Sequence, residues 1–403
     1  MSDDPFFALP EDSNWNALIG KQGYEENYVD GYIGAAQELA NIILEKDMYH
    51  KRDTLVLPIL YNARHGIELT LKMTIDYLVS NKILSHSHPK NHNLNSHLNH
   101  LINGPIPDEE INQCLIKLRP FIESLARIDN DGQELRFHKN KDGSKSMPNY
   151  SLVNIETLQN SLKSLSKILS DLKYRTFDYC REIKTKSHTS KCSRNDLFNI
   201  SKMLPKRSDW GRSEFNTIKT IIKKRYGLSN KQFSLALDKI LINREMCTNI
   251  DIEHELLHIR DDRALFLIQQ WLQIHPPRAP GFRLPPNNYS SKECRRAQEA
   301  RHSVIKKIEN HFSIDELADF ETIFYLARDK IYTELYEQEF EIKRKEYSKH
   351  NKDKNLAQEI HGLLTKTNFA TYFSIGTSIL GRPSLSRKIN ELTQIALPYP
   401  PGS

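Results

Sequence analysis

Apolar residues recur every three or four positions through most of this chain, which is the spacing of helices that bury one face. The first long run covers residues 26–47 and includes Val29, Ile33 and Ile43. Few stretches alternate in the way of half-buried strands, so the sequence predicts a mostly α-helical fold. Further helical runs follow at residues 54–81, 108–129, 151–176 and 313–347.

Residues 130–147, NDGQELRFHKNKDGSKSM, interrupt this pattern. They contain two Asp-Gly pairs, and Asp-Gly is a strong signal for the turn of a two-stranded hairpin. We therefore expect a small hairpin near residues 131–150, inside an N-terminal helical bundle.

The length of 403 residues favours more than one domain. We expect the helical bundle at residues 1–178, and then a basic linker at 179–213 that is rich in Lys, Arg and Ser. A helical region at 214–380 follows, with a Pro-rich loop at 276–290, and a helix with a loose tail makes up 381–403. A basic stretch like 179–213 is most often solvated, and the alternative is a contact surface for nucleic acid.

Three features bear on the location of the protein. The N-terminus MSDDPFFALPEDSNWN is acidic and lacks the charged-then-apolar pattern of a signal peptide. The sequence has no apolar run of about 18 residues, as a membrane-spanning helix would need. The five cysteines are scattered, which fits neither a disulfide framework nor a paired zinc site. We expect a cytoplasmic protein with no membrane partner.

Four segments, in order, resemble the HEPN superfamily of helical bundles found in nucleotidyltransferase partners, toxins and antiphage ribonucleases. YVDGYIGAAQELA resembles the first helix. LYNARHGIELTLKMTIDYL resembles the second, with Ile67, Glu68, Leu71 and Lys72 in its polar–Ile–Glu–x–x–Leu–Lys pattern. HNLNSHL resembles the start of the third helix. IDNDGQELRFHKNKDG resembles the hairpin of one subset, with His138 in place of the usual Pro.

The resemblance covers residues 25–175. It implies a bacterial protein of toxin or antiphage type that acts on RNA or nucleotides and forms a homodimer through the bundle. Members that cleave RNA carry Arg, four to six residues, and then His near the start of a late helix. Pairs with that spacing occur here outside the expected place, at Arg181–His188, Arg295–His302, Arg296–His302 and Arg344–His350.

The charged face of the second helix is the leading candidate site. Arg64, Glu68 and Lys72 share this face at four-residue intervals. One interpretation is an internal ladder of salt bridges that also ties to Arg136. The other is a polar pocket between this helix and the hairpin, where two arginines could bind a phosphate.

In the pocket interpretation, the resemblance to ribonucleases implies catalytic roles. Arg64 and Arg136 would bind the phosphate, and His65 or His138 would transfer the proton. The substrate-binding candidates are Glu68 and Lys72. A nearby His-rich segment contains no Cys or carboxylate, and we expect it to be a solvated loop rather than a metal site; its histidines are His86, His88, His92, His97 and His100.

The string His254-Glu255-Leu256-Leu257-His258 has the letters of a zinc-peptidase motif. On a helix it would place two imidazoles on one face with a carboxylate beside them, and we expect a helix at 251–274. A zinc site also needs a third protein ligand. The candidates for that ligand are His275, Glu293, Glu299 and His302.

The sequence leaves three functions open. The leading one is a protein that acts on RNA or nucleotides, in its catalytic form a metal-independent ribonuclease with no cofactor. The first alternative is a non-catalytic module that binds nucleic acid or a partner. The second is a zinc metallopeptidase that uses His254, Glu255 and His258.

Overall fold

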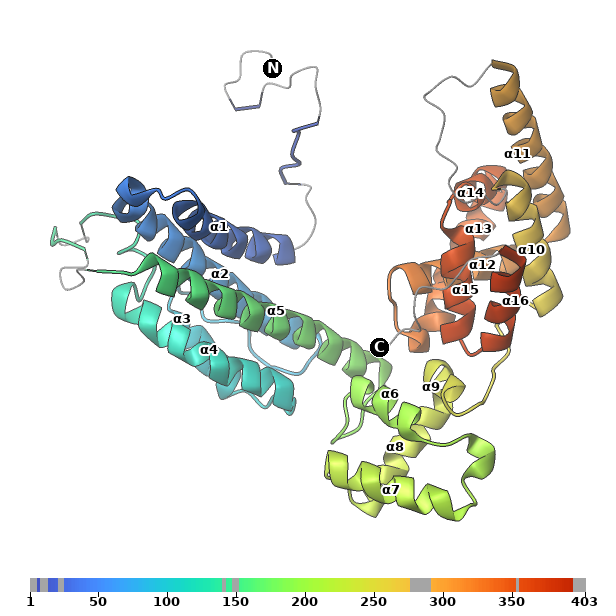
Figure 1. The fold of residues 1–403 in the computed structure, drawn as a ribbon, viewed down its shortest axis with the longest axis horizontal. Coiled ribbons are helices and arrows are strands. Elements are labelled where there is room, and N and C mark those ends of the chain that lie inside the picture. Colours follow the sequence, from blue (N-terminus) through green and yellow to red (C-terminus); the bar gives the residue numbers. More distant parts are fainter. Residues whose placement is uncertain are drawn as a thin grey trace. The chain divides into compact units, whose positions relative to one another are not determined.

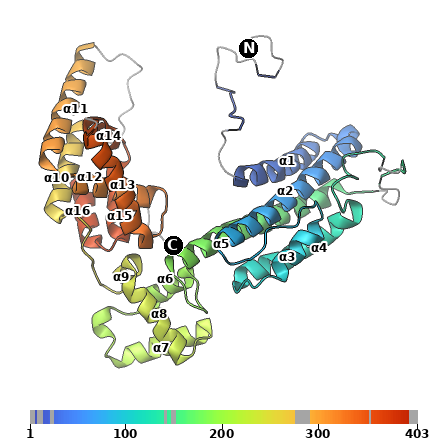
Figure 2. The same cartoon turned by 180° about the vertical axis from the view of Figure 1, so that it is seen from behind.

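The computed structural model confirms a mostly α-helical protein, with no strand among the residues that it describes. The chain divides into two compact units, Met1–Lys184 (unit 1) and Thr185–Ser403 (unit 2). Figures 1 and 2 show the helices of each unit from two sides. The structure describes residues 6–7, 14–20, 25–139, 143–146, 152–275, 291–352 and 355–393.

Unit 1 is a helical bundle in which α1 and α2 pack along their length. Leucine and isoleucine side chains from all five helices fill one core, and Ile59, Ile67 and Leu71 of α2 are fully buried in it. Burial of this apolar face stabilises the helices, since in proteins most helical stability comes from tertiary packing rather than from helix propensity. The helices are α1 (Glu25–Glu45), α2 (Arg52–Ser80), α3 (Leu94–Ile102), α4 (Glu109–Ile128) and α5 (Ile155–Thr185).

Of the hairpin expected near residues 131–150, the described residues show one antiparallel bridge, between Lys139 and Lys145. Beside it, the Ser146 N–H donates to the carbonyl of His138 at 3.0 Å. The segment just before is a compact turn in which both carboxylate oxygens of Asp129 accept backbone N–H groups, which leaves fewer donors for a strand ladder. The remaining residues of the predicted hairpin, 140–142 and 147–150, lie outside the described residues.

The basic linker expected at residues 179–213 is wrong, because this segment is folded. Helix α5 continues to Thr185, and α6 (Arg194–Met203) begins at a capping box formed by Ser193 and Asp196. Leu197 and Ile200 of α6 are fully buried. Exposed Lys202 lies on the same helix as these buried residues, and a count of charges along the sequence does not distinguish such an amphipathic helix from a solvated linker.

Unit 2 contains two apolar cores. The first is built from residues 192–250, which are consecutive in the chain. It includes η2 (Arg207–Asp209), α7 (Ser213–Tyr226), α8 (Asn230–Ile242) and α9 (Arg244–Thr248). The Ser229 side chain caps the N-terminus of α8 by accepting the Gln232 N–H.

The second core of unit 2 joins residues 256–389. Gly376 on α15 lies so close to the backbone of Ile323 on α12 that a methyl group at this position would overlap the Ile323 carbonyl. The helices of this core are α10 (Asp261–Ile274), α11 (Ser291–His311), α12 (Ile314–Arg328), η3 (Thr333–Leu335), α13 (Tyr336–Lys352), α14 (Leu356–Leu364), α15 (Phe369–Ile379) and α16 (Pro383–Thr393).

The helix expected within 381–403 is α16, but it is not a separate region. Leu385 and Ile389 of α16 are fully buried in the second core, so the predicted boundary at residue 381 is wrong. The Pro-rich loop at 276–290 and the tail after Thr393 lie outside the described residues.

Within the part of the chain that the structure describes, no helix combines the length and apolar character needed to cross a bilayer. Four cysteines, Cys114, Cys180, Cys192 and Cys247, are buried free thiols.

Candidate functional site

The expected helix at 251–274 begins only at Asp261, so the HELLH string is not helical. Residues 251–260 form an extended segment, which we call the strap. The His254 N–H donates to the carbonyl of Gly381 at 2.8 Å, and the His258 N–H donates to Asp319 at 2.8 Å. The imidazoles of His254 and His258 therefore do not share the helix face on which the zinc interpretation depends.

The side chains of the strap have other partners. Glu255 pairs with Arg382 at 2.9 Å, and Arg382 also binds Glu253 and Asp261. The exposed ring of His258 stacks on Phe340, with the ring centroids 4.4 Å apart. These contacts hold the strap against the second core of unit 2.

One cluster of carboxylates in the described residues has the spacing of a metal site, namely Asp129, Asp131 and Glu134. Asp129 is fully buried, and its oxygens already accept the N–H groups of Gly132, Gln133 and Leu135. The neighbouring carboxylate of Asp129, together with burial, raises the pKa of Glu134 to about 7.

Arg64 lies at the centre of unit 1, with only 2% of its surface exposed. Its guanidinium donates to Glu68 at 3.1 Å, to the carbonyl of His92 at 2.5 Å and to the carbonyl of Asp129 at 3.0 Å. Gly132 (φ +84°) allows the turn to lie against the Arg64 guanidinium, since a methyl group at this position would lie 3.1 Å from Arg64 Nη1. The internal ladder of Arg64, Glu68 and Lys72 is confirmed, but its expected tie to Arg136 is not, since Arg136 donates to the Gly132 carbonyl instead.

Three side chains donate to the Glu68 carboxylate, namely those of Arg64, Lys72 and His92. We call these four residues together the Glu68 cluster. Lys72 Nζ lies 2.6 Å and His92 Nδ1 2.8 Å from the same oxygen, Oε1. Burial alone would raise the pKa of Glu68, but the hydrogen bonds and charges of Lys72 and His92 outweigh it and lower the pKa. Glu68 is therefore a carboxylate at neutral pH.

An ionised carboxylate can only accept hydrogen bonds, so His92 must carry its proton on Nδ1. Nε2 of a neutral His92 is then an acceptor. The side chain of His92 is 63% exposed, whereas that of Glu68 is 3% exposed. The cluster thus places an imidazole at the surface and orients it with a buried carboxylate, which is the arrangement of an acid–base residue.

The other predicted site residues are His65, Arg136 and His138. Within the described part of the chain they make no hydrogen bond or ion pair with the Glu68 cluster, but His65 and Arg136 both contact Tyr61. The ring of His65 stacks on Tyr61 and contacts Tyr32 edge-on at 4.3 Å. Arg136 also contacts this group, with its guanidinium 5.9 Å from the Tyr61 ring centroid. Burial, with a smaller opposing effect of the Glu68 charge, lowers the pKa of His65. Exposed His138 contributes its carbonyl to the bridge described above.

His92 is the residue of this site that the sequence did not reveal. It belongs to the His-rich segment expected to be a solvated loop, and its partner lies 24 positions earlier in the chain. One signal was available, because His92 directly precedes Asn93, whose side chain caps α3 and fixes the loop at that point.

Unit 2 carries a second candidate, a surface on α6, η2 and α7 where cations lie over aromatic rings. We call it the basic–aromatic surface. Arg207 lies 4.6 Å from the Trp210 ring and Arg225 lies 5.7 Å from the Tyr226 ring. Trp210 in turn stacks on Phe215 at 5.2 Å. A further pair of this kind is Lys202 with Phe198.

Several cations of this surface have no carboxylate within ion-pair distance among the described residues, namely Arg207, Lys219, Lys223, Lys224 and Arg225. Uncompensated cations over half-buried rings suit a ligand that has both negative charge and flat aromatic groups.

Comparison with protein-family models, with curated proteins and with solved structures finds no match to this chain.

Proposed function

We propose that this protein binds nucleic acid, and RNA in particular, through the basic–aromatic surface of unit 2. The observation that carries the proposal is the pairing of uncompensated cations with half-buried rings on α6, η2 and α7. Cations contact the phosphates of any nucleic acid, whereas aromatic rings stack on unpaired bases. A single strand is therefore favoured over a duplex, whose bases are already stacked.

The test replaces Lys224 and Arg225 together by alanine and measures binding of a labelled single-stranded RNA by fluorescence anisotropy over a series of salt concentrations. We expect weaker binding, and a slope of log affinity against log salt that falls by about 1 for each lost phosphate contact. Trp210→Ala should weaken binding by about 1–3 kcal/mol with the slope unchanged.

The matched control is the double substitution Lys345→Ala and Lys349→Ala. It removes the same charge from the outer face of α13, in the same unit. If this control weakens binding as much as the change at Lys224 and Arg225, the attraction is non-specific and the proposed surface is wrong.

A second candidate function rests on the Glu68 cluster, where a buried carboxylate orients an exposed imidazole. His92 Nε2 would take the proton from the 2′-hydroxyl of RNA, and that oxygen would attack the neighbouring phosphorus. The bond from phosphorus to the 5′-oxygen breaks, and this oxygen takes up a proton from water. The products are a 2′,3′-cyclic phosphate and a 5′-hydroxyl, and His92 returns its proton to solvent.

This function is tested by incubating the protein, with EDTA present, with a fluorescent single-stranded RNA and with the same oligonucleotide in deoxy form. We expect cleavage of the RNA alone, and a decrease of about 10²–10⁴-fold in His92→Ala. His100→Ala is the control, since His100 belongs to the same segment and contacts the His86 carbonyl instead. Equal cleavage by the His92 variant and the original protein would reject this role.

The homodimer that the resemblance implies stays a prediction for the bundle of unit 1. Sedimentation of the full chain measures it directly.

A further inference from the structure

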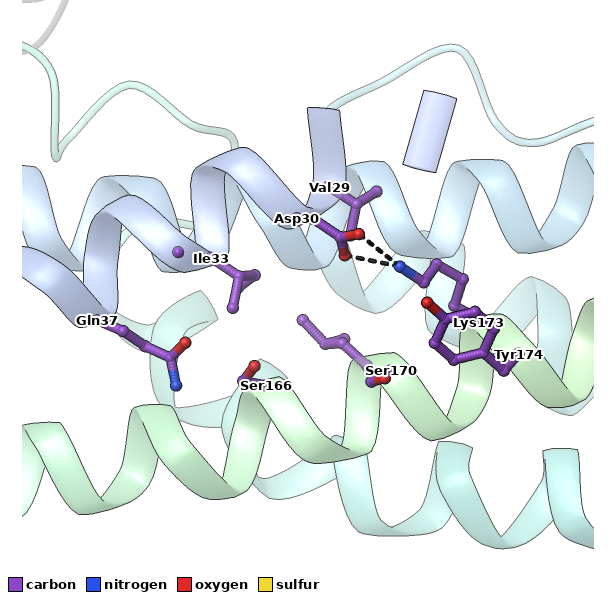
Figure 3. A pocket seen from close by; sticks show the side chains of 10 residues that line it. Val29, Asp30, Ile33, Gln37, Ser166, Ser170, Lys173 and Tyr174 are labelled. Carbon is purple, nitrogen blue, oxygen red and sulfur yellow. Dashed lines mark hydrogen bonds and ion pairs between the residues drawn. The ribbon is translucent and has the colours of Figure 1, made fainter. Parts of the chain in front are cut away.

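The cavity between α1 and α5 of unit 1 belongs to neither of these sites. Its volume is about 250 Å³, and Val29, Ile33 and Leu169 form its apolar floor. Figure 3 shows polar side chains from both helices around this space. Ligand pockets usually have volumes of about 300–1,000 Å³, so this cavity suits a molecule of one ring rather than a peptide.

Hydrogen-bonded pairs link α1 and α5 at two places that bracket the cavity along the helices. On one side, Lys173 Nζ lies 2.7 and 2.8 Å from the two carboxylate oxygens of Asp30, as Figure 3 shows. On the other side, the Gln159 amide donates to the side chain of Asn41 at 2.7 Å. The spacing between the two helices is therefore fixed, and the cavity does not depend on a loop.

Between these two pairs, three further polar side chains line the cavity. Gln37, Ser166 and Ser170 line the cavity and are half-buried, and their side chains make no hydrogen bond within the described part of the chain. Gly34 lies among them, and a methyl group there would find nothing within 4 Å. An amide and two hydroxyls in a helix interface, with open space between them, can form hydrogen bonds to a bound ligand.

The charges of the cavity select against an ion. The only cation in its lining is Lys173, whose side chain is 3% exposed and whose charge is compensated by Asp30. An anion would meet the Asp30 carboxylate, and a cation would meet Lys173. The ring of Tyr174 lies beside the pair, 4.7 Å from Lys173 Nζ, and is 57% exposed. It offers a flat apolar surface for the face of a small ring.

We propose that this cavity binds a small neutral polyhydroxylated molecule of the size of one sugar ring. Its hydroxyls both donate and accept, and so can satisfy Gln37, Ser166 and Ser170, while its C–H face packs on Tyr174. This binding is independent of nucleic-acid binding by unit 2, because it uses other residues of another unit.

The test uses saturation-transfer NMR of the full-length protein with D-ribose, D-glucose and ribose 5-phosphate as separate probes. We expect transfer to at least one neutral sugar. Gly34→Leu fills the cavity and should abolish this signal, whereas Gly31→Leu should retain it. Gly31 is the matched control because it lies on the same helix, also has nothing within 4 Å, and does not line this cavity. Both changes favour helix, so the fold is retained.

Ser166→Ala with Ser170→Ala should weaken the transfer several-fold without filling the space. The proposal is overturned if neither neutral sugar shows transfer, if Gly34→Leu binds as the original protein does, or if ribose 5-phosphate alone binds. The last outcome would identify an anion site. None of these results affects the RNA-binding measurement on Lys224 and Arg225.

Discussion

Replacing Arg64 by alanine is expected to lower the free energy of unfolding of unit 1 by about 3–5 kcal/mol. The substitution leaves the carboxylates of Glu68 and Asp129 in the interior without their shared cation, and removing one partner of a buried ion pair costs far more than the pair contributes. Both carboxylates are at most 3% exposed, so water cannot replace the guanidinium. Urea unfolding, followed by hydrogen exchange of the α2 amides, measures the loss in this unit.

Two further substitutions sharpen the Arg64 result. Arg64→Lys keeps the charge but not the planar fork that reaches Glu68 and three backbone carbonyls at once, so we expect an intermediate loss. Arg119→Ala is the control, because Arg119 is 45% exposed and lies 4.0 Å from Glu123. A surface pair of this kind contributes about 0–1 kcal/mol. A similar loss in Arg64→Ala and Arg119→Ala would show that the Arg64 contacts do not stabilise the bundle.

The stability of unit 2 is expected to depend on pH through Asp319. Asp319 is fully buried, and burial raises the pKa of its carboxyl from 3.8 to about 6, although Tyr336 and the His258 N–H donate to it. The folded chain then binds the proton more tightly than the unfolded chain. Stability therefore decreases as the pH rises from 3.8 to about 6, by about 3 kcal/mol, and is constant above that range.

Asp319→Asn isolates this contribution from those of the other carboxyl groups. Asparagine keeps the shape and an acceptor for the His258 N–H but does not titrate. We expect the difference in unfolding free energy between the original protein and this variant to change with pH over the same range. Urea unfolding at several pH values, monitored by the fluorescence of Trp271 in the same core, measures the difference. A difference that stays constant with pH would contradict the raised pKa.

The long helices of unit 1 were predictable because each carries its own periodic apolar face, whereas the sequence predicts a linker where α6 lies. The face of Arg64, Glu68 and Lys72 was predictable for the same reason, since both ion pairs join residues one turn apart. The remaining partners of Arg64 were not. Asp129 and Asn130 lie 65 and 66 positions away, and no local pattern links them to α2.

The strap shows where a local pattern misleads. Ile252, Leu256 and Ile259 have helical spacing, yet the backbone N–H groups between them bond to Gly381, Tyr336 and Asp319. Backbone N–H groups can form hydrogen bonds to distant groups in place of helical hydrogen bonds, because helix propensity is a weak preference that tertiary contacts override. The letters HELLH carried no information about these acceptors.

During synthesis on the ribosome, the strap is made long before some of the residues that it contacts in the folded protein. The first core of unit 2 uses consecutive residues, so it can form as soon as residue 250 has left the exit tunnel. Glu255 can form its ion pair with Arg382 only after Arg382, which is 127 positions later, has been synthesised. At about 5–20 residues per second this takes roughly 6–25 seconds. During that interval the newly made strap, with Leu256 and Ile259 uncovered, is available to chaperones, and translation of α16 ends that availability.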